Sequence, residues 1–355
     1  MNLIELTRTL IDIPSLSGSE AAVADFLFSY LLGLGYAVER QEVSEGRANI
    51  IATLDEPARV MLSTHMDTVP PHIASSEDDE YVYGRGACDA KGIIAAQIVA
   101  AEALRAEGVR EIGLLFTVDE ELGSLGARAA NLHARAGDCR FLINGEPTDN
   151  RLAVGSKGSL RLVIKAEGRA AHSAYPEHGE SAIERLLDVL ADVRACRWPT
   201  DSFFGETTCN IGVVRGGTRP NVIPTEAQAE IQIRLVTDAG PVCEALERAV
   251  AGRARVEYLS VAAPVRMLAV EGFEPCIVRF TTDIPHLTNW GAPLLIGPGS
   301  ILLAHTDQER IAKRELDEAV LLYAGLARSL LARDSSDARR EALTEREAMS
   351  EEAQL

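Results

Sequence analysis

The sequence has few aromatic residues, and its charge is strongly one-sided. Phe, Trp and Tyr make up 5% of the 355 residues, and Gly and Pro are close to their average use, which excludes collagen-like, prion-like and low-complexity chains. The formal net charge of −18 argues against a nucleic-acid partner, because a phosphate backbone binds to a basic face. We therefore expect a globular protein that binds no nucleic acid.

Paired cysteines and long apolar runs are also missing. The six cysteines include no CxxC pair, which is more typical of reduced thiols than of a disulfide framework or a zinc ribbon. No apolar run reaches the roughly 18 residues of a membrane span, and Glu5 and Arg8 interrupt the stretch where a signal peptide would be apolar. These absences predict a cytoplasmic protein with no membrane partner.

The order of apolar segments predicts an α/β protein of two domains. Strand-like runs alternate with amphipathic segments in residues 1–157 and 265–333, which predicts a mixed, mostly parallel sheet with helices on both faces. Residues 158–264 read strand, helix, strand, strand, helix, strand, which predicts an inserted ferredoxin-like βαββαβ domain. Residues 334–355 are charged and hardly apolar, so we expect a disordered tail there.

The first candidate site is His65-Met66-Asp67, at the end of a predicted strand. Alternate side chains of a strand share a face, so His65 and Asp67 lie on the same side of the chain. A metal-binding imidazole is commonly oriented by a carboxylate in this way. The alternative is a strand-end histidine with only a local hydrogen bond.

Two further segments place carboxylates at helix starts. The glycine-rich segment 83–92 delivers Asp89 to the start of a predicted helix, where it could also be a simple N-cap. A nucleotide loop is disfavoured because the third glycine of that fingerprint is missing. Three adjacent carboxylates follow a later strand: Asp119, Glu120 and Glu121. Their negative charges repel one another unless bound cations or protons compensate the charge. The alternative interpretation is a solvated acidic start of a helix.

Two more potential ligands follow later strands. Glu146 comes one glycine after the predicted strand 141–144, and His305 follows the predicted strand 293–296. Open α/β sheets place their sites at the carboxyl ends of parallel strands, which is where all these residues are predicted to lie. Histidine and carboxylate ligands together suit Zn²⁺, and also Co²⁺ or Mn²⁺.

In combination, the motifs STHMDTVP, GRGACDAKG, DEELGS, GEPT, AHSAYP and AHTDQE resemble those of one enzyme family. It is the di-zinc aminoacylase, acetylornithine deacetylase and succinyl-diaminopimelate desuccinylase family of metallopeptidase-like hydrolases. The resemblance covers the chain from Leu3 to about Leu331. The segments GEPT, SKG and GPGSI look most like acetylornithine deacetylase.

The resemblance implies two divalent metal ions, with zinc as the first choice. It assigns His65, Asp89 and Glu146 to one ion. It assigns Glu121, His305 and again Asp89 to the other ion, so that Asp89 bridges the two. It also implies a cis peptide bond just after Asp89.

The resemblance also implies roles outside the ligand set. Asp67 resembles the carboxylate that orients the first histidine ligand, and Glu120 resembles the general base and acid. In the inserted domain, His172 resembles a histidine that reaches across a dimer to the scissile carbonyl oxygen. Asn221 and Arg234 lie where related enzymes hold the substrate carboxylate. By residue type alone, these three could equally be a turn histidine, a loop residue and a surface charge.

The reaction that the resemblance implies is metal-assisted amide hydrolysis of a small N-acyl-L-amino acid, first of all an N-acetyl one. The chain is shorter than acetylornithine deacetylases, and its segment TTDIPHLTNWG differs from theirs. Alternatives are succinyl-diaminopimelate desuccinylase, a dipeptidase or aminopeptidase, and release of lysine or ornithine from an acidic carrier protein. The last is disfavoured because the net charge of −18 opposes docking to an acidic partner.

A protein that keeps this fold but only binds ligands is the alternative from a different class. It is disfavoured because all five candidate ligands and Glu120 are present. The family resemblance also implies a homodimer, and the helix and edge strands of the inserted domain could pair across a two-fold axis.

Overall fold

The computed structural model describes residues 1–55 and 57–352. The chain forms two compact units: unit 1 comprises Met1–Val154, Met267–Cys276 and Thr282–Leu355, and unit 2 comprises Gly155–Arg266 and Ile277–Thr281. Two of these boundaries lie within three residues of those predicted from the sequence. The short piece Ile277–Thr281 was not predicted, because it joins unit 2 through long-range hydrogen bonds to both the backbone N–H and the carbonyl of Lys157.

Unit 1 is built on a mixed sheet whose strands lie in the order β1-β2-β6-β3-β7-β17-β8. The four central strands are parallel, and the outer ones are antiparallel to their neighbours. The predicted α/β class is therefore confirmed. The strand bounds are β1 (Ala37–Ser44), β2 (Arg47–Thr53), β3 (Val60–His65), β6 (Ile112–Thr117), β7 (Phe141–Asn144), β8 (Leu152–Ser156) and β17 (Ala292–Leu295).

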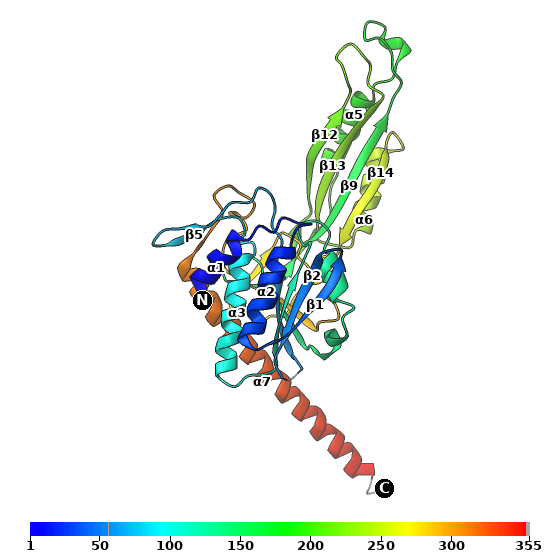
Figure 1. Ribbon diagram of the computed structural model, residues 1–355. Helices are drawn as coiled ribbons and strands as arrows, with labels where there is room; N and C mark the ends of the chain where they lie inside the picture. Colours follow the sequence, from blue (N-terminus) through cyan, green and yellow to red (C-terminus); the bar gives the residue numbers. More distant parts are fainter. Residues whose placement is uncertain (56, 353–355) are drawn as a thin grey trace. The chain divides into compact units, whose positions relative to one another are not determined.

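Both faces of this sheet are buried. Ile50 and Leu62 belong to one hydrophobic core, whereas their chain neighbours Ile51 and Met61 belong to a second one. Successive side chains of a strand point to opposite faces, so apolar residues at both positions require cover on both sides. Residues of α1, α2, α3 and α7 cover the first face (Figure 1), and those of α4 cover the second. These helices are α1 (Leu3–Asp12), α2 (Ala21–Leu34), α3 (Lys91–Ala106), α4 (Leu125–Ala130) and α7 (Lys313–Glu352).

Helix α3 begins two residues after Asp89, where the sequence predicted the start of a helix. Its sequence is rich in Ala and Ile, and most of these residues are buried because α3 packs against α1, α7 and strand β3. The peptide bond between Asp89 and Ala90 is cis, as the family resemblance implied.

Helix α7 extends through most of the segment 334–355, for which we predicted a disordered tail. This corrects the prediction for residues 334–352. That prediction rested on the lack of apolar residues, but Ala, Glu, Arg and Leu dominate the segment and favour helix without burial. Residues 353–355 lie outside the described residues.

Unit 2 holds a four-stranded antiparallel sheet in the order β12-β13-β9-β14, with α5 and α6 packed on one face (Figure 1). The chain order is βαββαβ, in agreement with the predicted ferredoxin-like domain. Its elements are β9 (Gly158–Glu167), α5 (Ala182–Ala195), β12 (Thr208–Gly216), β13 (Glu226–Leu235), α6 (Gly240–Val250) and β14 (Arg255–Ala262).

Shorter elements complete the two units. Strands β18, β5 and β4 form a small sheet in unit 1, β10 pairs with β11 in unit 2, and β15 and β16 pair with β8. Within the described part of the chain, no helix is long and apolar enough to cross a membrane, and all six cysteines are unpaired. The bounds are β4 (Ser76–Glu77), β5 (Tyr81–Tyr83), η1 (Ala134–Asp138), η2 (Pro176–His178), β10 (Thr200–Asp201), β11 (Gly205–Glu206), β15 (Val265–Arg266), β16 (Pro275–Val278), η3 (Ile284–His286) and β18 (Arg310–Ala312).

Candidate active site

The candidate site lies in unit 1, at the carboxyl edge of the parallel strands. His65 is the last residue of β3, and Glu120 and Glu121 follow the end of β6. Glu146 follows β7, and the loop after β17 carries His305. Parallel neighbours end at the same edge of a sheet, so strand order alone brings these segments together.

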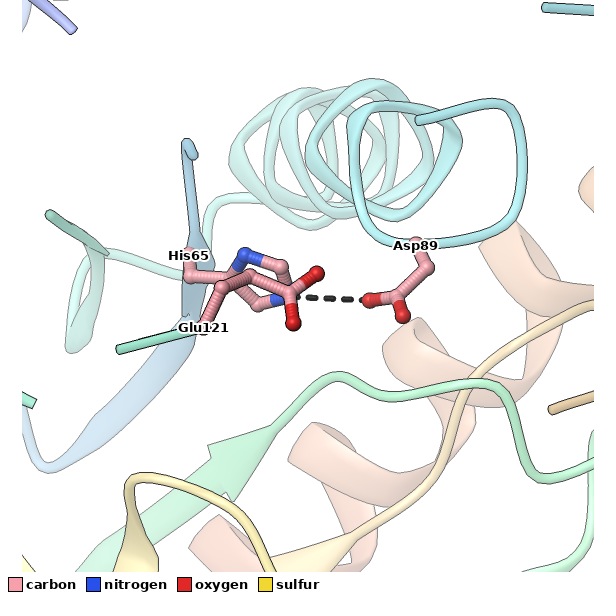
Figure 2. Close-up of side chains that lie close together, drawn as sticks. All are labelled: His65, Asp89 and Glu121. Atoms are coloured by element: carbon pink, nitrogen blue, oxygen red, sulfur yellow. Dashed lines mark hydrogen bonds and ion pairs between the residues drawn. The ribbon is translucent and has the colours of Figure 1, made fainter. Parts of the chain in front are cut away.

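Asp89 lies between the two histidines. Its Oδ1 is 2.9 Å from Nε2 of His65, and its Oδ2 is 3.2 Å from Nε2 of His305. Nε2 of His305 also lies 2.9 Å from Oε1 of Glu121. One oxygen of Asp89 thus faces each histidine, which is the arrangement of a bridging ligand. Ligand atoms of His65, Asp89 and Glu121 all lie within 4.8 Å of one another (Figure 2).

Glu146 completes the cluster electrostatically. Burial raises the pKa of Glu146 well above its usual range, and the charges of Asp89 and Glu121 raise it further. Its Oε1 is buried without a hydrogen-bond partner among the described residues. A buried carboxylate oxygen without a partner is costly, and a cation would satisfy it. The donor set therefore fits a divalent metal.

Asp67 orients three groups of the site. Nδ1 of His65 lies 3.0 Å from the backbone oxygen of Asp67 and 3.5 Å from its Oδ1. The Asp67 carboxylate also accepts hydrogen bonds from the backbone N–H of Glu120 (3.0 Å) and of Glu121 (3.2 Å), and from Oγ of Ser17 (2.7 Å). Asp67 therefore fixes both glutamates as well as the histidine, whereas the sequence predicted only the histidine contact.

Glu120 is a partly buried carboxylate next to the candidate ligands. Burial raises the pKa of Glu120 well above its usual range, and the nearby charges of Glu146 and Asp283 add to the effect. A raised pKa makes a carboxylate a stronger proton acceptor than an ordinary glutamate. This is the property that a general base and acid needs.

Sequence reasoning missed the cation beside the three adjacent carboxylates. Nη2 of Arg47 lies 2.8 Å from Oδ1 of Asp119 and 2.6 Å from Oε1 of Glu20. Arg47 therefore compensates the negative charge of Asp119, the first of the three carboxylates. Glu120 and Glu121 are the two that face the site. Arg47 is far from Asp119 in the sequence, so no local pattern identified it.

Asp283 is a buried carboxylate near the site that the sequence analysis did not identify. Its Oδ2 accepts a hydrogen bond from Oγ1 of Thr117 at 2.7 Å, and burial raises the pKa of Asp283 to about 6. It lies in TTDIPH, part of the segment that differs from acetylornithine deacetylases, and that difference was the only signal available.

Unit 2 contains the other three predicted site residues, and it brings two of them together. His172 forms a β-bridge with Val222, and the backbone oxygen of Asn221 accepts a hydrogen bond from Ser173. Nδ1 of His172 accepts a hydrogen bond from the backbone N–H of Ala174, which leaves Nε2 as the protonated nitrogen. His172 can therefore donate a hydrogen bond through Nε2.

Arg234 lies at the other end of strand β13. In the pairing of β13 with β9, Glu226 lies opposite Glu167 and Leu235 lies opposite Gly158. The loops that carry His172 and Asn221 adjoin the Glu226 end of the sheet, whereas Arg234 lies near the Leu235 end. Arg234 is eight positions along the strand from Glu226, which corresponds to about 26 Å. Arg234 donates a hydrogen bond to Oγ1 of Thr281 there.

The model of peptidase family M20/M25/M40 matches residues 61–329. The chain belongs to this family. A peptidase M20 domain-containing protein of Schizosaccharomyces pombe is 37% identical over 333 residues, which cover 91% of this chain and 83% of that protein. A probable carboxypeptidase of Aspergillus niger is 37% identical over 371 residues, which cover 92% and 89%. This M20 protein is thus a hydrolase of the metallopeptidase class.

Solved structures share its fold. An M20 family metallo-carboxypeptidase from Sulfolobus solfataricus superposes with a TM-score of 0.74 at 17% identity, over 93% of this chain and 99% of that one. A dinuclear metal-binding M20 peptidase from Bacillus subtilis superposes with a TM-score of 0.66, also at 17% identity, over 92% and 96%. The family implied by the sequence motifs is confirmed at the level of M20 hydrolases, and its acetylornithine deacetylase branch stays a prediction.

Proposed function

We propose that this M20 protein is a two-metal hydrolase that cleaves the amide bond joining an acyl or aminoacyl group to a C-terminal amino acid. The observation that carries the proposal is the placement of Asp89 between two histidines, with the partly buried Glu120 beside them. This pattern supplies metal ligands together with a separate proton acceptor.

The proposed ligands are those that the family motifs implied. His65, Asp89 and Glu146 would hold one ion, and Asp89, Glu121 and His305 the other. Zn²⁺ is the first choice, with Co²⁺ or Mn²⁺ as alternatives for the same nitrogen and oxygen donors. When bound, such ions polarise a carbonyl oxygen and lower the pKa of water. The dinuclear site of the Bacillus subtilis relative supports a pair of ions.

Three side chains would carry out the remaining steps. The Glu120 carboxylate takes a proton from the attacking water and returns it to the leaving nitrogen. Nε2–H of His172 donates a hydrogen bond to the carbonyl oxygen as negative charge develops there. Asp67 keeps Glu120 in place through the backbone hydrogen bond described above.

A short peptide is our first choice of substrate, and an N-acyl-L-amino acid is the second. Relatives with 35–37% identity are named probable carboxypeptidases, which supports the peptide. The motifs shared with acetylornithine deacetylases support the N-acetyl amino acid. Both reactions release a free amino acid, so they differ only in the acyl side of the cleaved bond. Succinyl and carrier-protein substrates rank below them.

A substrate panel tests this proposal. Full-length protein reconstituted with Zn²⁺ or Co²⁺ is assayed for amine release from dipeptides, longer peptides, N-acetyl and N-succinyl amino acids, each also with an amidated C-terminus. We expect hydrolysis of substrates with a free C-terminal carboxylate and little hydrolysis of their amides. Failure to bind metal, or equal cleavage of amidated substrates, would overturn the proposal.

Replacing Arg234 with methionine should raise KM by about 10–100-fold with little change in kcat. We propose that its guanidinium holds the substrate carboxylate, and a charge-assisted hydrogen bond contributes about 1.5–3 kcal/mol. Asn221 lies at the opposite end of the unit 2 sheet, so it could contact the same carboxylate only from a second protomer. Arg161→Met on the neighbouring strand β9 is the matched control and should leave KM unchanged. An Arg234→Met enzyme that keeps the wild-type KM for free carboxylates would contradict this assignment.

Uptake of the metal ions should release protons and become weaker as the pH falls. Asp89 and Glu121 raise the pKa of His305 to about 10 in the metal-free protein, so His305 is protonated at pH 7. A protonated imidazole cannot coordinate a metal, so affinity should rise by about tenfold per pH unit for each proton displaced, up to about pH 10. Calorimetry in buffers of different ionisation enthalpy measures the proton release. His178→Gln in unit 2 is a control, and pH-independent affinity between about pH 6 and 9 would contradict the expectation.

We also propose that the protein is a homodimer through unit 2. Strands β12 and β14 are the outer strands of its sheet, and among the described residues each pairs on one side only. Such edges are suited to pairing with a second copy across a two-fold axis. Light scattering of the purified protein measures the mass directly, and a monomer at micromolar concentration would refute the proposal.

A further inference from the structure

A buried ion pair, Arg85 with Glu309, lies among the loops that carry Asp89 and His305. Both residues are 2% exposed, and Nη1 of Arg85 is 2.6 Å from Oε2 of Glu309. Burying two charges costs solvation free energy that their attraction does not reliably recover, so such a pair is weak evidence for stability. Its contacts indicate a different role.

Glu309 fixes the backbone at Asp89. Its Oε1 accepts hydrogen bonds from three backbone N–H groups, those of Gly86 (3.0 Å), Cys88 (3.3 Å) and Asp89 (3.2 Å). Three donors that converge on one oxygen define the path of the loop immediately before the bridging carboxylate. Glu309, which positions Asp89, therefore lies four residues after His305 in the sequence.

Arg85 makes the reciprocal connection to the His305 loop. Its Nη1 donates to the backbone oxygen of Thr306 at 3.0 Å, next to His305, and its Nε donates to Pro71 at 3.3 Å. The two loops also touch directly, because a Cβ on Gly299 would lie 2.5 Å from Cβ of Cys88. The ion pair thus joins the backbone at Asp89 to the backbone beside His305.

The two proposed metal sites differ in how their ligands are held. His65 ends a central strand and is oriented by Asp67, and Glu146 follows another central strand. His305, by contrast, lies in an irregular loop at a left-handed φ of 63°, with a side chain that is 48% exposed. Its separation from Asp89 depends on the contacts between the two loops.

We propose that Arg85 and Glu309 are positioning residues for the second metal ion, the one assigned to Asp89, Glu121 and His305. They set the distance between two of its ligands and so determine its affinity, while the first ion depends mainly on the sheet. This inference rests on the two-metal site of the proposed function.

Zinc titration of metal-free, full-length Glu309→Gln protein tests it, with bound zinc measured by elemental analysis. We expect the wild type to bind two ions per chain, and the variant to bind the first ion normally and the second about 10–100-fold more weakly, the usual effect of losing a partner that orients ligands. Excess zinc should then restore kcat. Glu107→Gln is the matched control, because it breaks a two-bond pair with Arg328 at the far end of α3.

Two results would overturn this role. Unchanged zinc binding would show that the Arg85–Glu309 pair does not position the ligands. An equal loss of affinity for both zinc ions would show that the pair supports only Asp89, which the two sites share. If Glu309→Gln does not fold, Arg85→Lys keeps the charge but cannot reach Glu309 and Thr306 together, and it should show the same selective loss. A wild type that binds fewer than two ions would instead refute the two-metal site itself.

Discussion

Replacing Glu120 with glutamine is expected to lower kcat by about 10²–10⁴-fold while metal content stays near that of the wild type. The amide has nearly the shape of the carboxylate but cannot accept a proton from the attacking water. Glu120 is also outside the proposed ligand set, and its backbone N–H would still bond to Asp67. Steady-state kinetics and elemental analysis of the same preparation measure the two effects separately.

Glu121→Gln is the matched control, since it changes the adjacent residue in the same way. Oε1 of Glu121 lies 2.9 Å from Nε2 of His305, so this substitution should reduce occupancy of one metal ion. Added zinc should recover part of its activity, whereas it should not help Glu120→Gln. If the two variants show the opposite phenotypes, the roles of the adjacent glutamates have been assigned the wrong way round.

The candidate metal ligands could be predicted because they are tied to local patterns. His65 ends one apolar strand segment, Glu146 follows another after a single glycine, and Asp89 precedes an Ala-rich helix. Parallel strands then bring such positions to one edge without any further information. The fold of each unit was predictable for the same reason, since periodicity and element order are local properties of the sequence.

The residues that support the ligands could not be predicted in the same way. Arg47 is paired with Asp119, Thr117 with Asp283, and Arg85 with Glu309, and each pair joins segments far apart in the chain. No spacing rule relates such partners, because their contact is a product of the folded structure. Glu309 stands in the AHTDQE motif, yet residue type alone did not separate its role from that of a surface acid.

The balance between carboxylates and cations also shows why Glu120 differs from its neighbours. Arg47 neutralises Asp119, and His305 faces Glu121, whereas the charges that act on Glu120, apart from that of His65, are those of other carboxylates. Burial and these like charges together raise its pKa. Three consecutive acidic residues therefore acquire three different environments within a single turn.

Replacing His172 with alanine should lower kcat by about 10²–10³-fold, the usual cost of losing one hydrogen-bond donor to a developing oxyanion. Metal content should not change, because His172 belongs to unit 2 and to neither proposed ligand set. Its Nε2 is the protonated nitrogen, so His172→Gln, which keeps a donor, should retain more activity than His172→Ala. Loss of metal in His172→Ala would contradict this role.

Mixing the inactive variants tests whether His172 acts on the site of its partner. In a heterodimer of His172→Ala and Glu120→Gln chains, one site combines an intact Glu120 with an intact His172 from the other protomer. Random exchange makes half of the dimers mixed, each with one working site, so activity should recover to about a quarter of the wild-type level. Mass spectrometry of the intact dimers checks the exchange. If exchange occurs without recovery, His172 acts within its own chain or has no part in catalysis, because only a contribution across the dimer can restore a complete site.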